Sequence, residues 1–199
     1  MTITTETLTV VTRADHIPGP AQGQWTYADY AALPADEYRY EIVDGVLYMS
    51  PAPGTSHQGS ISRLVHYLMS HVEMAGLGRV FAAPIDVELS PLRVVQPDVI
   101  VILSANLGII TPSRIIGAPD LVVEIAAPST AGYDRREKQD TYAEAGVREY
   151  WIADPAARTV EVLTLEGPAY RSLNAFQGRA QMPTRVLPSF PVAVEQLFG

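Results

Sequence analysis

The sequence contains no cysteine, and this absence removes several chemistries at once. Without thiols there is no disulfide framework, no thiolate nucleophile and no cysteine-ligated zinc. Any metal site must therefore use oxygen ligands or the 4 histidines. Long apolar runs are also missing, because no stretch approaches the roughly 20 residues that span a bilayer, and the N-terminus lacks the pattern of a signal peptide. We therefore expect a cytoplasmic protein without membrane contact.

Positive charge is scarce as well. The 199 residues include 14 Lys and Arg against 22 Asp and Glu, which gives a net charge of -8. This charge opposes non-specific attraction to nucleic acid or anionic lipid, so a nucleic-acid substrate would need a local basic patch or a metal. The phosphate-binding, zinc-protease and serine-nucleophile motifs with fixed spacing are also absent.

What is present suffices for one folded domain. Hydrophobic residues make up 47% of the chain, which excludes disorder as a description of the whole. The first 22 residues are polar and include the turn-forming Pro18-Gly19-Pro20. We expect a mobile arm over residues 1–22 and a single domain over residues 23–199.

Turn signals and periodicity predict the elements of that domain. Asp44-Gly45 joins two strand-like runs, which is typical of a hairpin with a type I′ turn. Apolar residues at helical spacing predict a long helix from residue 55 or 56 to Gly76 or Gly78. The other predicted elements, in chain order, are a helix over 26–33, strands over 79–89, 95–103 and 121–126, a helix over 133–145, strands over 149–153 and 159–165, and short edge strands after Gly167. This order predicts a mixed β-sheet with helices packed on it.

Two acidic residues interrupt the apolar strands. Asp98 follows Pro97 at the start of one run, and Glu124 lies within the next. An unpaired buried carboxylate costs several kcal/mol, so such a group is usually paired, protonated or bound to a metal. If the two strands are neighbours, the carboxylates converge and a divalent cation would relieve their repulsion. The alternative is one acid at a strand end and one paired with an arginine.

Further candidates surround this pair of acids. Glu41 lies in the hairpin and is either a surface residue or a third acid of the site. His57 shares the apolar face of the long helix, where it either borders the core or positions a phosphate or a water. Asp134 and Lys138 are spaced for a helical salt bridge, but their helix follows the Glu124 strand, so Lys138 could look back over the acids.

Several motifs together point to a known family. In chain order they are Tyr40–Gly45, Ser50–Pro53 with His57, Gln96–Asp98, Val123–Thr130, Asp134 with Lys138, and Gly146–Pro155. Each motif is weak alone, but their shared order resembles the Uma family of endonucleases, in the PD-(D/E)XK or restriction-endonuclease-like superfamily. The resemblance runs from about residue 25 to the C-terminus and implies an α/β fold, with a mixed β-sheet, flanking helices and an N-terminal β-hairpin.

The resemblance also implies a metal site. Asp98 corresponds to the family's motif aspartate and Glu124 to its second metal-binding acid. Glu41 corresponds to the acid contributed ahead of the core, and the Ile125 carbonyl would complete the ligand set. The implied cofactor is Mg²⁺, with Mn²⁺ as an alternative.

One position departs from the family pattern. The superfamily places a lysine two residues after the second acid, where this chain has Ala126. We expect Lys138 to replace it as the fourth catalytic residue, beside Glu41, Asp98 and Glu124. His57, Gln96 and Asp134 are expected to be auxiliary.

These roles predict a metal-dependent endonuclease that hydrolyses DNA phosphodiester bonds. The alternative is a non-catalytic nuclease-like module that binds a protein or nucleic-acid partner. This interpretation becomes the better one if Lys138 does not reach the acids. Basic residues that could contact phosphates are Arg63, Arg135, Arg136 and Lys138. The hairpin and the apolar tail could form the face of a homodimer.

Overall fold

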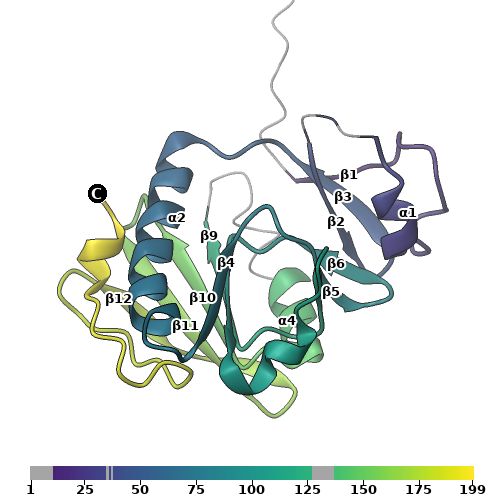
Figure 1. Cartoon of the computed structure of the whole chain (residues 1–199). Helices are drawn as coiled ribbons and strands as arrows, with labels where there is room; N and C mark the ends of the chain where they lie inside the picture. Colours follow the sequence, from purple (N-terminus) through teal and green to yellow (C-terminus); the bar gives the residue numbers. More distant parts are fainter. Residues whose placement is uncertain (1–10, 35, 37, 127–136) are drawn as a thin grey trace, which may run out of the picture.

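Two β-sheets form the frame of the molecule (Figure 1), which is a computed structural model that describes residues 11–34, 36, 38–126 and 137–199. The first sheet has the order β1 (Thr12–Arg13), β3 (Val46–Ser50), β2 (Arg39–Val43), β6 (Arg93–Val95), β5 (Val87–Ser90) and β8 (Ile115–Ile116). The second has the order β12 (Ala169–Gln177), β11 (Thr159–Glu166), β10 (Glu149–Asp154), β9 (Leu121–Ile125), β7 (Val99–Leu103) and β4 (Gly78–Ala82). Parallel and antiparallel pairs occur in both sheets, which confirms the predicted mixed α/β class.

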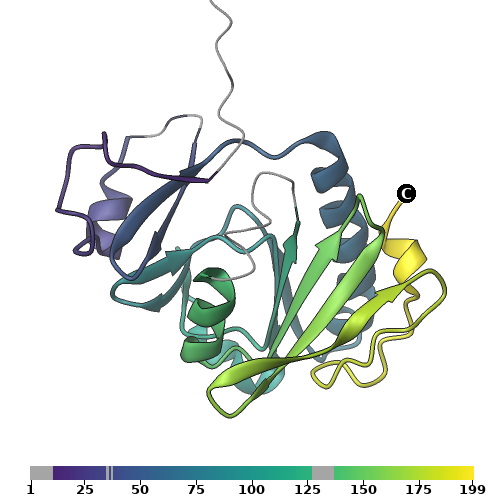
Figure 2. The same cartoon turned by 180° about the vertical axis from the view of Figure 1, so that it is seen from behind.

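Helices cover the sheets and fill the space between them (Figures 1 and 2). Helix α1 (Tyr27–Ala31) lies beside the hairpin, and α2 (Thr55–Leu68) continues into a π-helical turn, η1 (Met69–Glu73). Helix α4 (Gln139–Ala145) inserts Tyr142 into a buried cluster that draws residues from both sheets. Short 3-10 helices, η2 (Ser104–Ile109) and η4 (Val194–Leu197), complete the fold. No helix within the described ranges is long and apolar enough to cross a membrane.

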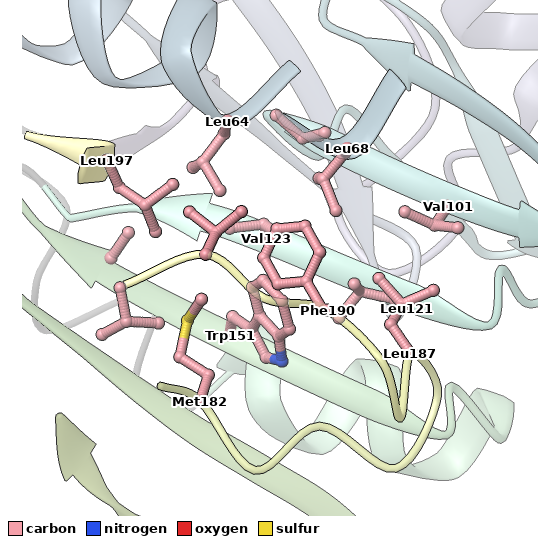
Figure 3. Packing of buried hydrophobic residues seen from close by; sticks show 14 of the residues in the cluster. Leu64, Leu68, Val101, Leu121, Val123, Trp151, Met182, Leu187, Phe190 and Leu197 are labelled. Carbon is pink, nitrogen blue, oxygen red and sulfur yellow. The ribbon is translucent and has the colours of Figure 1, made fainter. Parts of the chain in front are cut away.

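The largest core lies between α2 and the second sheet (Figure 3). Leu64 and Leu68 of α2 are fully buried above Val123 of β9 and Trp151 of β10. The segment after β12 closes this core with Phe190 and other apolar side chains. The periodicity that predicted the long helix therefore marks the face that this core buries.

The predicted hairpin is confirmed as β2 and β3. Asp44 and Gly45 both have positive φ, 50° and 71°, as a type I′ turn requires. A Cβ at Gly45 would lie 2.3 Å from the backbone oxygen of Gly23, so close approach of the chain also favours glycine here.

Two predicted strands are wrong in extent, because each is divided between the sheets. The run over 79–89 splits into β4 and β5, and the run over 95–103 splits into β6 and β7. Each break contains a proline, Pro84 or Pro97, which has no N–H for a sheet ladder. The chain passes from the first sheet to the second across Gln96–Asp98, so this crossover places Asp98 where the two sheets meet.

The two ends of the chain also differ from expectation. Thr12–Arg13 already pairs with β3, and Ala14 is fully buried, so residues 11–22 pack on the hairpin instead of forming a free arm. After Gly167 the chain forms the long edge strand β12, where short strands were expected, because it continues the antiparallel ladder of β11. The predicted start of the helix over 133–145 lies outside the described residues, and its described end is α4, closed by Gly146 at a φ of 87°.

Candidate active site

The candidate site lies where the β6–β7 crossover meets β9. Strands β7 and β9 are antiparallel neighbours, with Val99 opposite Val123, and this register brings Asp98 beside the Glu124–Ile125 step. The backbone N–H of Ile125 donates to Asp98 Oδ2 over 2.8 Å. The condition for convergence of the two acids, that their strands are neighbours, is therefore met.

Asp98 is buried in an environment that favours its ionised form. His57 Nε2 lies 3.0 Å from Asp98 Oδ2, and Arg39 Nη1 lies 3.5 Å from Asp98 Oδ1. Burial by itself raises the pKa of this carboxyl group. The hydrogen bond and charge of His57, the charge of Arg39 and the Ile125 N–H outweigh that effect and hold the pKa below its ordinary value of 3.8.

Glu41 and Glu124 are joined by one lysine. Lys138 Nζ lies 2.9 Å from Glu124 Oε1 and 3.1 Å from Glu41 Oε1. Two further donors fix these carboxylates: the backbone N–H of Gln96 donates to Glu41 Oε1 over 2.7 Å, and Tyr142 donates its hydroxyl to Glu124 Oε1 over 2.6 Å. The pKa of Tyr142 is raised well above 10.0 by burial and by the charges of Glu124 and Glu41, so its hydroxyl keeps the proton that it donates.

Local geometry explains why these side chains meet. Arg39 and Glu41 are two residues apart on β2 and therefore point to the same face of the sheet. Lys138 and Tyr142 are four residues apart at the start of α4, so both lie on one side of the helix and reach Glu124. His57 reaches Asp98 from the first turn of α2.

The basic side chains balance the charge of the acids. Arg39 is mostly buried; burial alone would lower the pKa of its guanidinium, but the charges of Glu41, Asp98 and Glu124 outweigh burial and raise it. The sequence suggested that a divalent cation would be needed to relieve repulsion between the acids. In the structure Lys138 and Arg39 already compensate them. Arg39 beside Asp98 is the arginine pairing that the sequence left open as an alternative, and Lys138 pairs with Glu124 and Glu41.

The donor atoms suit a hard divalent cation, but the described side chains are not arranged as a ready set of metal ligands. Carboxylate oxygens of Asp98, Glu124 and Glu41 are the ligand type that Mg²⁺ and Mn²⁺ prefer. Among the described residues, however, no three Asp, Glu or His side chains are grouped closely enough to hold a metal ion. The ammonium of Lys138 instead contacts two of the expected ligands. The residues thus fit magnesium by chemistry, and its binding stays a prediction.

The structure brings together most of the residues that the sequence singled out: Glu41, His57, Gln96, Asp98, Glu124, Ile125 and Lys138. Asp134, Arg135 and Arg136 lie outside the described residues. Lys138 is only 5% exposed, so it belongs to the buried centre and not to a surface patch for phosphates.

Two residues of this network were missed as site residues. Arg39 could have been found from the alternation of β2, which puts it on the face of Glu41. Tyr142 shares the helical face of Lys138, but its hydrogen bond to Glu124 depends on how α4 docks and has no sequence signal of its own.

Comparisons with known proteins agree with the fold. A family model named Uma2, described as "Putative restriction endonuclease", matches residues 27–195. A solved structure described as a "putative nuclease belonging to DUF820 from Anabaena variabilis ATCC 29413" superposes with a TM-score of 0.73 at 21% sequence identity, covering 87% of this chain and 97% of the other. At this identity the superposition supports the fold. No curated protein matches the chain.

Proposed function

Because the chain belongs to the Uma2 family, we propose that it hydrolyses phosphodiester bonds of DNA as a magnesium-dependent endonuclease. The observation that supports this most is the position of Lys138, which reaches Glu124 and Glu41 from the start of α4. It thereby supplies a buried ammonium beside the two acids, as the lysine that is missing at Ala126 would do. If the contacts of Lys138 with Glu124 and Glu41 served only to stabilise the fold, a third acid, Asp98, would not be needed beside them where the two sheets meet.

Under this proposal the acids would hold the metal. Asp98 and Glu124, with the Ile125 carbonyl, would be its ligands, and Glu41 would complete the set or hold a water. Bound there, Mg²⁺ would supply Lewis acidity toward a phosphate oxygen and toward an attacking water.

The remaining side chains have positioning and charge-stabilising roles. Lys138 would orient the attacking water and stabilise negative charge that develops on the phosphate. Arg39 and His57 keep Asp98 ionised and fixed through their contacts at 3.5 and 3.0 Å. Tyr142 fixes the carboxylate of Glu124 by donating to Oε1.

One observation favours a second candidate function. The acids are already neutralised by basic side chains, and the described residues contain no preformed group of metal ligands. A domain of this kind could keep the nuclease fold as a non-catalytic module that binds a protein or nucleic-acid partner.

Cleavage of plasmid and single-stranded DNA by the full chain tests the proposal. We expect nicking with Mg²⁺ or Mn²⁺, none with EDTA, and at least a hundredfold loss in Asp98→Asn. Asp15→Asn removes the same charge at a 64% exposed side chain and should cleave like the wild type. Cleavage that persists in EDTA or in Asp98→Asn would refute the proposal.

Binding of labelled DNA separates the two candidate functions. If metal completes the site, Ca²⁺ should strengthen binding without turnover, because it reduces the negative charge of the acids and can ligate the phosphate. Equal affinity with and without Ca²⁺, or no binding in either condition, would favour the interaction module.

A further inference from the structure

Two adjoining cavities lie next to the acidic centre. One has a volume of about 460 Å³, the other about 330 Å³, and both are lined by Tyr30, Pro84 and Gln96. The larger continues to Phe81, Asp86 and the loop before β8, while the smaller continues to Arg39 and Tyr38. Both volumes lie within the range of small-molecule sites, about 300–1,000 Å³.

Gln96 connects these cavities to the candidate active site. Its backbone N–H donates to Glu41, and its carbonyl oxygen accepts from Arg39 Nη2 over 2.6 Å. Its side chain lines both cavities and donates from Nε2 to Tyr30 and to Asp86. A group bound in the larger cavity would therefore touch Gln96, the same residue whose backbone contacts Glu41 and Arg39.

Asp86 gives the larger cavity a hydrogen-bond acceptor. Its Oδ1 accepts from the Tyr30 hydroxyl over 2.7 Å and from Gln96 Nε2 over 2.9 Å. Its Oδ2 has no hydrogen-bond partner among the described residues, and the residue is half-buried. A carboxylate in this position repels phosphate and accepts from an N–H group of a ligand.

Ring, aliphatic and polar side chains together form the other walls of the cavity. The rings of Tyr30 and Phe81 and the aliphatic groups of Pro84, Ile85 and Ile110 line one part of it. The loop before β8 adds the polar side chains of Thr111, Ser113 and Arg114. Ring faces beside polar side chains suit a flat heterocycle with an edge of hydrogen-bond donors. Nucleic-acid bases that have left the stack are held in this way in other proteins, by rings on their faces and hydrogen bonds on their edges.

We infer that this cavity receives one unstacked nucleobase of the bound DNA strand, and that Asp86 selects a base with an exocyclic amine. This inference rests on the proposed function, because it takes DNA as the ligand. Cytosine, adenine and guanine each present an amino group that Asp86 Oδ2 can accept from, and thymine does not. In thymine the ring N–H is flanked by two carbonyl oxygens, which a carboxylate repels.

Labelled oligo(dC) and oligo(dT) test the inference with the full chain in Ca²⁺, read by fluorescence anisotropy. Both are pyrimidine strands, so they differ mainly at the edge that Asp86 would read. We expect the wild type to bind oligo(dC) about tenfold more tightly than oligo(dT). Asp86→Asn keeps an acceptor for Tyr30 and Gln96 but replaces Oδ2 by a donor, so the preference should disappear or reverse.

Two further variants keep the test sharp. Tyr30→Phe keeps the aromatic wall and removes the hydroxyl that orients Asp86, so it should weaken the preference without abolishing binding. Asp15→Asn is the charge-matched control and should keep the preference. Thermal melting of each variant shows whether it is folded.

Each result has a defined meaning. A base preference that depends on Asp86 supports the cavity even if the protein never cleaves DNA, which would refute only the proposed function. Cleavage without any base preference, or a base preference that is unchanged in Asp86→Asn, would overturn the inference about the cavity and leave the proposed function standing. Free dCMP competing as strongly as the oligonucleotide would assign the cavity to a mononucleotide and also overturn the inference.

Discussion

Lys138 Nζ lies 2.9 Å from Glu124 Oε1, although 14 positions separate the two residues in the chain. The lysine approaches from the start of α4 and the glutamate from β9, which belongs to the second sheet. A lysine two residues after Glu124 would reach the same carboxylate from the strand itself. The helix therefore delivers the ammonium that Ala126 cannot.

Removal of this ammonium should separate catalysis from metal binding. In Lys138→Ala we expect the cleavage rate to fall at least a hundredfold, because the developing charge loses its stabiliser. Affinity for Ca²⁺ should not fall, since Glu41 and Glu124 lose a competing cation. Cleavage rates and calorimetric Ca²⁺ titration measure the two effects. Equal cleavage rates in wild type and variant would show that Lys138 has only a structural role, as a salt-bridge partner.

Asp98 should stabilise the metal-free protein in a pH-dependent manner. Its pKa is lowered in the folded state, so its contribution is present above the unfolded value of 3.8 and is lost as pH falls through the folded pKa. Asp98→Asn should lower the free energy of unfolding by about 2 kcal/mol at neutral pH. Urea unfolding in EDTA should show this difference shrinking as the pH is lowered below 3.8. A difference independent of pH, or a more stable variant, would contradict the assignment.

Tyr142→Phe removes one hydroxyl from the fully buried side chain that holds Glu124. We expect a loss of about 1–2 kcal/mol of stability together with a several-fold lower cleavage rate, because the carboxylate is less well fixed. Tyr170→Phe is the matched control, because this hydroxyl donates to the Val147 carbonyl oxygen at a distance of 2.7 Å and does not contact the acids of the site. Urea unfolding and cleavage assays should show similar stability losses but a lower rate only in Tyr142→Phe.

Glu149 should anchor the C-terminal segment without contributing to catalysis. This fully buried carboxylate accepts from Trp151 Nε1 and from the backbone N–H groups of Arg185 and Val186. Glu149→Gln places an amide donor against at least one of these donors and should cost about 2–4 kcal/mol. Hydrogen exchange should rise most around residues 182–198, whereas cleavage below the melting temperature should stay unchanged. Uniform exchange across the chain would argue against a local anchor.

The sequence predicted the local elements well where short-range chemistry decides them. Asp44-Gly45 specified its hairpin because a type I′ turn needs positive φ at both positions. The stripe containing Leu64 and Leu68 specified α2 because a helix must bury its apolar face. The acids of the predicted apolar runs, Asp98 and Glu124, became candidate site residues because buried charge requires a partner.

Only the tertiary structure decided how the strands divide and which partners the acids receive. Continuous apolar runs over 79–89 and 95–103 carry no signal for a change of sheet beyond Pro84 and Pro97, so the two-sheet arrangement was not predicted. Arg39 and Tyr142 meet Asp98 and Glu124 through strand register and helix docking, which involve residues far apart in the chain. Residue type and spacing thus determined which groups needed compensation, and packing between the sheets determined which groups supply it.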